Sequence, residues 1–210
     1  MMLNRSTRRK INCKSYHRIL ALLVLLVGLP LSTNADQFCL ILDPYFYRSP
    51  IRVPLQGTTQ TVLAYYRILD AETLAPAKLQ ELTAEAQSAV AQENLDRARR
   101  LLAVIRPEII RDSNGVITAL RVQSSDPTLS AILLLPELSN RYANLLGPDC
   151  YFAVPNRRTI FFLPRLATDI QSFAPLVHSL YHNDPWPIST EIFEIVDGKL
   201  RAHGQFNDDF

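Results

Sequence analysis

The chain has 210 residues, 48% of them hydrophobic, and a formal net charge of +2 at pH 7. All six charged residues within the first 35 are basic, so residues 36–210 carry 16 basic against 20 acidic side chains, a net charge of −4. This composition argues against a disordered chain and against a nucleic-acid-binding surface. Residues 36–210 are long enough for one domain with a hydrophobic core.

The first 35 residues predict an export signal. Six basic residues precede the apolar run Ile19 to Leu31, and the small residues from Ser32 to Ala35 suit a cleavage region. The run is shorter than the roughly 20 apolar residues that a spanning helix needs. We therefore expect an exported protein, periplasmic or extracellular, that uses the general secretory route rather than the twin-arginine route. The alternative is an uncleaved segment, in which residues 19–31 anchor the chain to the inner membrane and are its contact with lipid.

Residues 36–59 form an N-terminal segment rich in proline and aromatic residues. Residues 38–42 are continuously apolar and predict a strand. Residues 43–57 contain three prolines around the aromatic run Tyr45 to Tyr47, which excludes a helix and predicts an extended loop. We expect the aromatic side chains to cover an edge of the core; lining a pocket is the alternative.

An α+β domain is predicted for residues 60–205, and it opens with a strand and a long helix. Residues 61–69 are rich in β-branched and aromatic side chains, which favours a strand. Between residues 76 and 102 apolar residues recur every three or four positions, which predicts an amphipathic helix with a narrow apolar face. That face comprises Leu79, Leu82, Ala86, Ala89, Val90, Ala98, Leu101 and Leu102.

The rest of the chain alternates short strands with short helices. Asn114-Gly115 and Asp197-Gly198 lie between apolar runs and predict two hairpins. Expected strands are residues 108–111, 116–122, 150–154, 159–163, 191–196 and 199–202, and expected helices are residues 136–146 and 173–182. Periodicity does not assign residues 128–135, and residues 206–210 are expected to be a flexible tail. Together these elements predict a single compact α+β domain with a largely antiparallel sheet, one long amphipathic helix and two or three shorter helices.

Two cysteines, Cys39 and Cys150, lie beyond the predicted signal. In an exported protein they can form one disulfide, which would close a long loop and constrain the unfolded chain. Each cysteine also begins an apolar run, so two buried free thiols are the alternative.

Patterns for catalysis, cofactors and metals are sparse. The chain contains no glycine-rich phosphate loop, no Gly-x-Ser-x-Gly elbow and no His-Glu-x-x-His motif, which disfavours the commonest hydrolases and nucleotide-binding enzymes. No cofactor is predicted. His178 and His182 share one helix face, with Asp184 just beyond, but a histidine pair alone is a weak pattern, and no metal site is predicted. Glu191 and Glu194 are expected to be solvated charges.

Residues 155–158, Pro-Asn-Arg-Arg, form a polar stretch between two apolar runs. Pro155 and Asn156 favour a tight turn through their own backbone preferences. If both arginines face one concavity, Asn156, Arg157 and Arg158 make a candidate site for a carboxylate or phosphate. The alternative is that the two guanidinium groups stay in water on opposite sides of the turn.

Several short motifs occur in an order that resembles a known family. They lie in the segments VLAYYRILDAETLAPAKLQELTAEAQSAVAQENL, LSAILLLPELSNRYANLLGPDCYFAVPNRRTIFFLP and PISTEIFEIVDGKL. The matching positions are Asp70, Gln92 to Leu95, Ser130 to Leu134, Pro155 to Arg158 and Ser189 to Phe193. Over about residues 60–200 the chain resembles the YtpQ-like bacterial family of unknown function. The resemblance implies a compact α+β domain and no particular activity.

Two features depart from that family. Arg158 stands where the family's Pro-Asn-Arg-Asp turn has an acidic residue, and an export signal precedes a domain usually found inside cells. Any role that the family's turn aspartate performs would therefore be missing from this chain.

The favoured function is that of a non-catalytic, exported binding domain. It would engage an envelope protein or a small anionic ligand through the proline- and aromatic-rich loop and the turn at residues 155–158. The alternative is a hydrolase-like enzyme with a cleft near Arg157, Arg158, His178 and His182. A third and weaker hypothesis is a metal carrier that uses the two histidines.

Overall fold

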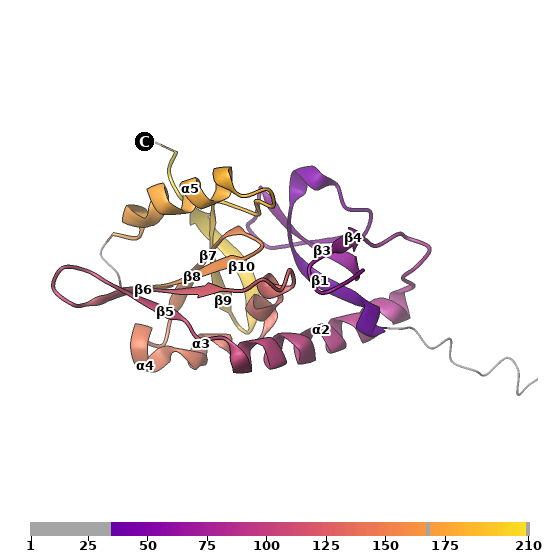
Figure 1. The fold of residues 1–210 in the computed structure, drawn as a ribbon, viewed down its shortest axis with the longest axis horizontal. Coiled ribbons are helices and arrows are strands. Elements are labelled where there is room, and N and C mark those ends of the chain that lie inside the picture. Colours follow the sequence, from indigo (N-terminus) through magenta and orange to yellow (C-terminus); the bar gives the residue numbers. More distant parts are fainter. Residues whose placement is uncertain (1–34, 167–168, 209–210) are drawn as a thin grey trace, which may run out of the picture. The chain divides into compact units, whose positions relative to one another are not determined.

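The computed structural model describes residues 35–166 and 169–208, which form an α+β fold (Figure 1). Two antiparallel sheets, one long helix and several shorter helices make up this part of the chain. The predicted α+β class is therefore confirmed, although the strands divide between two sheets. Except for Ala35, the predicted export signal lies outside the described residues, as do the last two residues of the predicted tail.

The smaller sheet contains four strands from the N-terminal part of the chain. They are β1 (Phe38–Pro44), β2 (Arg52–Pro54), β3 (Thr61–Ile68) and β4 (Leu74–Pro76). The order is β1-β3-β2, and β4 also pairs with β3. β1 and β3 pair along the whole of β1, so the predicted boundary near residue 60 falls inside one sheet. The predicted loop after β1 contains a 3-10 turn, η2 (Tyr45–Tyr47), and the short edge strand β2.

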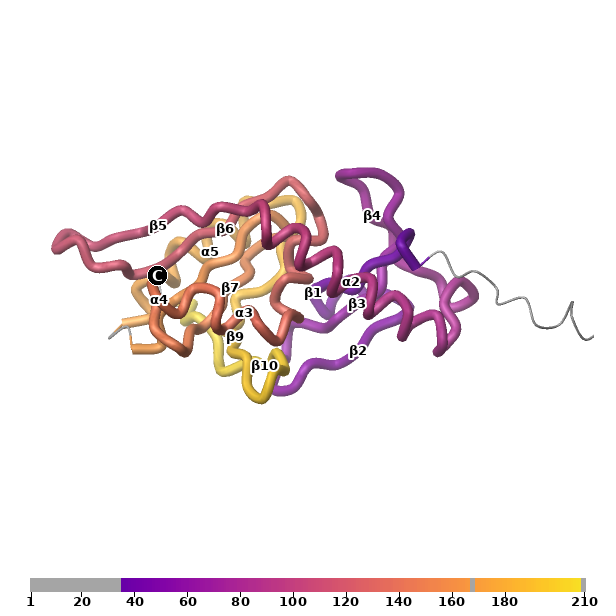
Figure 2. Tube along the Cα trace, turned by 90° about the horizontal axis from the view of Figure 1, so that it is seen from below, coloured from indigo at the N-terminus to yellow at the C-terminus, as the bar shows by residue number. Residues whose placement is uncertain are grey.

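The larger sheet has the order β10-β9-β7-β8-β6-β5. Its strands are β5 (Glu108–Arg111), β6 (Ile117–Gln123), β7 (Cys150–Asn156), β8 (Thr159–Pro164), β9 (Glu191–Val196) and β10 (Lys199–Gln205). Both predicted hairpins are confirmed: Gly115 has φ 82°, and Asp197 and Gly198 have φ 51° and 70°. The β5–β6 hairpin projects away from the smaller sheet in both Figure 1 and Figure 2.

The long helix α2 (Ala84–Val104) begins eight residues later than the periodicity predicts. Residues 74–76 pair as β4, and the side chain of Thr83 caps the helix by accepting a hydrogen bond from the backbone N–H of Ala86 at 3.2 Å. Leu79 is consequently exposed rather than part of the apolar face. The buried stripe repeats every four residues and consists of Ala86, Val90, Asn94, Ala98 and Leu102.

Asn94 is the polar residue of that stripe. Its side chain makes hydrogen bonds to the edge of β1 that a neighbouring strand would otherwise make. Its Oδ1 accepts a hydrogen bond from the backbone N–H of Leu40 at 3.0 Å, and its Nδ2 donates to the carbonyl of Leu40 at 2.9 Å. The hydroxyl of Ser130 accepts from the N–H of Leu42 at 3.1 Å. The free edge of β1 is thus closed by side chains, which prevents a further strand from pairing there.

In sequence, the shorter helices fall between successive strands of the larger sheet. They are η3 (Leu129–Leu134), α3 (Leu138–Arg141), α4 (Ala143–Leu146), η4 (Ile170–Phe173) and α5 (Ala174–Asn183). The unassigned segment at residues 128–135 is therefore largely a 3-10 helix, and the predicted helix at 136–146 is two single turns that meet at Tyr142. The predicted helix at 173–182 is confirmed. Within residues 35–166 and 169–208, no helix combines the length and apolar character needed to cross a membrane.

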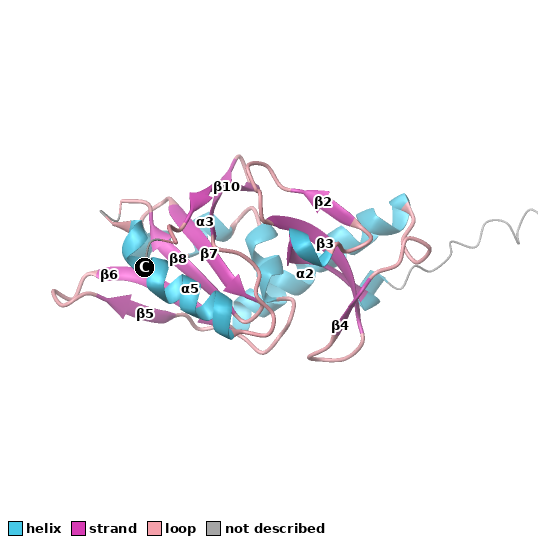
Figure 3. Ribbon diagram, turned by 90° about the horizontal axis from the view of Figure 1, so that it is seen from above, coloured by secondary structure: helices cyan, strands magenta, loops and turns pink. Residues whose placement is uncertain are grey.

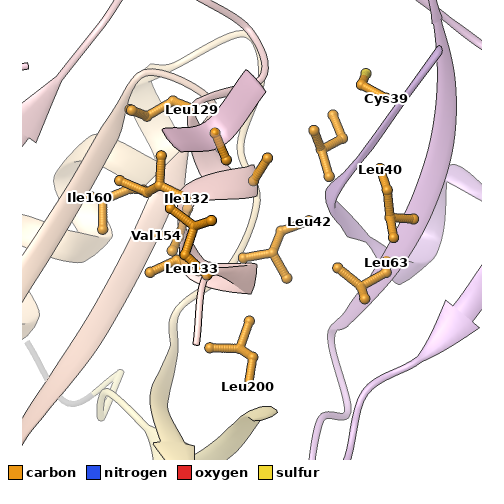
Figure 4. Close-up of a cluster of buried hydrophobic side chains, with 14 of the residues drawn as sticks. Cys39, Leu40, Leu42, Leu63, Leu129, Ile132, Leu133, Val154, Ile160 and Leu200 are labelled. Carbon is orange, nitrogen blue, oxygen red and sulfur yellow. The ribbon is translucent and has the colours of Figure 1, made fainter. Parts of the chain in front are cut away.

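Two apolar clusters occupy opposite faces of the larger sheet. The main one lies between the two sheets, η3 and α2, and Figure 4 shows Leu42 and Leu63 of the smaller sheet facing Ile132, Val154 and Leu200. The second lies under α5, where Ala174 and Val177 pack on the sheet. Figure 3 shows α5 over this outer face, while α2 lies on the other side in Figure 1.

The disulfide suggested by the sequence is not formed. Cys39 and Cys150 are both buried free thiols, on β1 of the smaller sheet and β7 of the larger sheet. Burial raises the pKa of each thiol to about 12, so both remain neutral apolar packing groups.

Candidate functional site

The asparagine of the β7–β8 turn is directed into the protein. Asn156 is buried, and its Oδ1 accepts a hydrogen bond from the backbone N–H of Arg158 at 3.0 Å. Its Nδ2 donates to the carbonyl of Leu180 in α5 at 3.4 Å. The first contact closes the turn and the second ties the turn to α5, so both polar groups of this side chain have partners within the fold.

Arg157 is buried where the two sheets meet, with 7% of its surface exposed. Its Nη2 lies 3.4 Å from Oδ1 of Asp43 in β1. The guanidinium stacks between two aromatic rings, 4.9 Å from the ring centroid of Tyr66 and 4.8 Å from that of Trp186. The sequence left two alternatives for Arg157, a guanidinium in water or one that binds an anion. The anion that Arg157 contacts is the carboxylate of Asp43 in its own chain.

Asp43 is fully buried and gathers two further donors. The hydroxyl of Ser49 donates to its Oδ2 and that of Tyr66 to its Oδ1, both at 2.8 Å. Burial, followed by the charge on Asp43, raises the pKa of Tyr66 above its ordinary value, so this hydroxyl stays protonated and can donate. A buried charge needs both a counterion and hydrogen bonds, and Asp43 has them.

Arg158, the second arginine of the turn, is exposed. It lines a depression of about 240 Å³ together with Arg157, Trp186, Ser125, Thr73 and Glu72. The two arginines therefore reach one concavity, as the sequence hypothesis required. The depression is smaller than the roughly 300–1,000 Å³ typical of small-molecule sites, and the carboxylate of Glu72 offsets part of its positive charge.

The histidine pair lines a different depression, of about 400 Å³, with Gln60, Tyr181, Thr190 and Asp208. His178 Nε2 lies 3.3 Å from Oδ1 of Asp208. Asp184, the third ligand considered from the sequence, accepts a hydrogen bond from the backbone N–H of Trp186 at 2.8 Å. Among the residues that the structure describes, no group of three or more His, Cys, Asp or Glu side chains is placed to hold a metal. The arginines and histidines assigned to a hydrolase-like cleft thus face two separate depressions.

Glu191, expected to be solvated, is a buried carboxylate at the same junction between the sheets. Five donors surround it: the backbone N–H groups of Thr59 and Gln60 and the hydroxyls of Thr59, Thr61 and Ser189, at 2.6–3.2 Å. The same loop is held against β10, because the N–H of Ala202 donates to the carbonyl of Gln56 at 2.9 Å. Gly57 is needed there: its φ is +77°, and a Cβ would lie 2.8 Å from the carbonyl oxygen of Ala202.

Glu194 is also buried rather than solvated, on the outer face of the larger sheet. Its Oε1 accepts from Arg201 Nε at 2.9 Å and lies 3.5 Å from His203 Nδ1, whose Nε2 is 3.2 Å from the hydroxyl of Tyr151. Burial alone would raise the pKa of Glu194, but the hydrogen bond and charge of Arg201, with His203, outweigh it and hold the pKa below its usual value. These contacts fasten β9 to β10 and β7.

Four exposed aromatic residues lie near the junction of the two sheets, where Arg157 and Asp43 pair. The exposed fractions are 53% for Tyr45, 56% for Phe46, 39% for Tyr47 and 47% for Trp186. η2 and the C-terminal end of α5, which precedes Trp186, lie on the same side of the fold, at the top of Figure 1 and towards the viewer in Figure 3. Burial, followed by the charge that Tyr47 carries when ionised, raises the pKa of Tyr181 in α5.

Two exposed arginines flank these rings. The guanidinium of Arg52 lies 4.7 Å from the ring centroid of Tyr45, and Arg48 ends η2 in the left-handed conformation, with φ 51°. The N–H of Tyr45 donates to the carbonyl of Gln60 at 2.7 Å, which fixes the turn to the start of β3. We call Tyr45, Phe46, Tyr47 and Trp186, with Arg48 and Arg52, the aromatic surface. The sequence placed its first three rings over a core edge or in a pocket, whereas they are exposed.

Comparison of the chain with protein-family models, with curated proteins and with solved structures finds no match. The resemblance to the YtpQ-like family remains a prediction from the sequence.

Proposed function

We propose that the protein is a non-catalytic binding domain and that the aromatic surface is its contact with a partner. The observation that carries this proposal is the exposure of four aromatic side chains, three of them consecutive on one helical turn. Rings that stay about half exposed bury only part of their apolar area within the monomer. In binding proteins, Tyr, Trp, Phe and Arg are the residues enriched at the centre of interfaces.

The fold beneath this surface supports the same proposal, because it holds the rings in place before a partner arrives. Trp186 rests on the buried guanidinium of Arg157, whose backbone N–H donates to the Trp186 carbonyl at 3.2 Å. η2 directly follows β1, whose Asp43 pairs with Arg157. Side chains fixed in this way lose little conformational entropy on binding.

The partner class proposed from the sequence, an envelope protein or a small anionic ligand, fits aromatic rings flanked by arginines. Export from the cell and membership of the YtpQ-like family are parts of the same proposal. The hydrolase-like alternative receives less support, because its residues are engaged elsewhere: Arg157 pairs with Asp43 and His178 with Asp208.

Site-specific photo-crosslinking tests this function. A benzoylphenylalanine is placed at Phe46 of the full chain, and in a matched control at Val104, which is 71% exposed at the end of α2 on the other side of the fold. After irradiation with envelope fractions, adducts are identified by mass spectrometry. We expect discrete adducts at position 46 and none at position 104. Equal labelling at both positions, or none at 46, would overturn the proposal.

A further inference from the structure

Resting on the proposed function, we infer that the partner of the aromatic surface is a lipid bilayer that carries anionic headgroups. The protein would lie on such a bilayer through this surface, in addition to any anchoring by residues 19–31. Three kinds of observation support this inference: the chemistry of the rings, the charge beside them and the net charge of residues 36–210.

The rings are of the type that occupies the boundary between lipid and water. Tyr and Trp are enriched at membrane interfaces because one end of each ring system is apolar and the other can hydrogen-bond. Here Phe46, the most exposed of the four, lies between Tyr45 and Tyr47 on a single turn. A turn of this composition can enter the headgroup region while the strands behind it remain in water.

Next to the three rings of η2 the charged side chains are Arg48 and Arg52, and both are exposed. In the described residues, no carboxylate forms an ion pair with Arg48 or Arg52. Asp43, just before the rings of η2, is buried and paired with Arg157, whereas Asp184 and Glu72 lie on the Trp186 side of the surface. Each basic residue close to an anionic membrane contributes about 1 kcal/mol of attraction.

Residues 36–210, which leave out the basic predicted signal, carry the opposite charge even with Arg48 and Arg52 counted. Residues 36–210 have a net charge of −4, so an anionic surface repels most of the protein and attracts the region around Arg48 and Arg52. This asymmetry selects one orientation, with the aromatic surface towards the lipid. Binding through a few rings and two arginines is expected to be weak, reversible and sensitive to salt.

Trp186 provides a direct readout, because it is the only tryptophan of the chain. The full chain is mixed with phosphatidylcholine vesicles, or with vesicles in which about a third of the lipid is phosphatidylglycerol. We expect a blue shift of Trp186 emission and protection from acrylamide only with the anionic vesicles, both reversed near 1 M salt, where the screening length is about 3 Å. Because residues 19–31 can insert into lipid by themselves, the environment of Trp186 is measured rather than co-sedimentation.

Two sets of variants separate this surface from the rest of the chain. Arg48→Gln and Arg52→Gln should each weaken binding to anionic vesicles about fivefold, the factor that corresponds to about 1 kcal/mol. Phe46→Ser should weaken it at least about tenfold, since it removes the most exposed apolar ring. The matched control is Val104→Ser with Arg106→Gln, an exposed apolar residue and an exposed arginine at the end of α2, which should leave binding unchanged.

The outcomes also distinguish this inference from the proposed function. An equal response to neutral and anionic vesicles, or equal effects of the control and the Arg48 and Arg52 variants, would overturn the lipid inference. If Trp186 does not respond to vesicles while crosslinks from position 46 identify one protein, the lipid inference fails and the binding function stands. If position 46 gives no adduct with lipid or protein, both fail.

Discussion

Asp43 and Glu191 are two buried carboxylates at the junction of the same two sheets, but they are surrounded by groups of different kinds. Asp43 has a cation, Arg157, held between two aromatic rings, and two hydroxyl donors. Glu191 has only neutral donors, five of them, from the loop before β3, from Thr61 at its start and from Ser189. The charge of Asp43 depends on one partner, Arg157, which is 114 residues away in sequence. Five separate hydrogen bonds hold Glu191 instead. Removal of a single group should therefore affect the two sites unequally.

The largest expected effect is that of Arg157→Met, which leaves Asp43 buried without its counterion. We expect a loss of about 3–5 kcal/mol in the free energy of unfolding, the usual result of breaking a buried ion pair from one side. Urea denaturation of the full chain followed by circular dichroism measures it. The double variant Arg157→Met with Asp43→Asn should lose less than the single variant, because no uncompensated charge remains. A loss below about 1 kcal/mol in the single variant would show that the ion pair is not what holds this junction.

The next effect is that of Glu191→Gln, which keeps the shape of the side chain but removes its charge. The substitution replaces one carboxylate oxygen by an amide NH2 group. This group donates hydrogen bonds, so the hydroxyl groups that face it must rotate to accept. We expect a loss of about 2 kcal/mol, within the range for hydrogen bonds to a charged group. Glu108→Gln on the exposed edge strand β5 is the control, and its effect should stay below about 1 kcal/mol. If the two variants lose the same amount, the five donors around Glu191 do not depend on its charge.

The elements of the fold could be predicted from local patterns, but these junctions could not. Hairpins at Asn114-Gly115 and Asp197-Gly198 and the strands β1 and β3 follow from turn chemistry and side-chain type, which act between neighbours. The predicted start of α2 was wrong because residues 74–76 form strand β4 by pairing with β3. Such pairing is a tertiary effect that periodicity does not contain.

The candidate site was predicted only in part, for the same physical reason. The turn at residues 155–158 and the aromatic loop were identified, yet the counterion of Arg157 lies far away in the sequence and no local rule points to it. Alternation along β9 did contain a signal that was overlooked, since Glu191 and Phe193 fall on the same face. Three motif positions that suggested a family, namely Asn94, Ser130 and Arg157, carry buried polar side chains that bond across elements, and a fourth, Ser189, is buried and bonds to Glu191 two residues on. Their pattern therefore has a structural explanation whatever the family.

A third way to bury an ionisable group is to keep it neutral, as the thiols of Cys39 and Cys150 show. Burial raises the pKa of both from 9.0 to about 12, so above pH 9 the unfolded chain loses these protons while the folded chain keeps them. The contribution of the two thiols to the free energy of unfolding is therefore fully present below pH 9 and is lost as the pH rises towards 12. At pH 10 the expected loss is about 1.4 kcal/mol for each thiol relative to pH 8. In Cys39→Ala the difference in unfolding free energy between pH 8 and pH 10 should shrink by about that amount, and an unchanged difference would contradict the assignment.

Glu194 gives the smallest effect, because its partners are partly in water. Arg201 and Arg165 expose 37% and 48% of their side chains, so solvent screens much of the attraction. The pKa of Glu194 is lowered from the usual 4.5, so its contribution is present above pH 4.5 and is lost as the pH falls through the folded-state value. We expect Glu194→Gln to be about 0.5–1 kcal/mol less stable than the parent at pH 7, with the gap closing towards pH 3. A gap that stays constant with pH would mean that the side chain stabilises β9 by packing alone. A gap as large as that of Glu191→Gln would mean that partly exposed arginines compensate a buried carboxylate as well as five buried donors do.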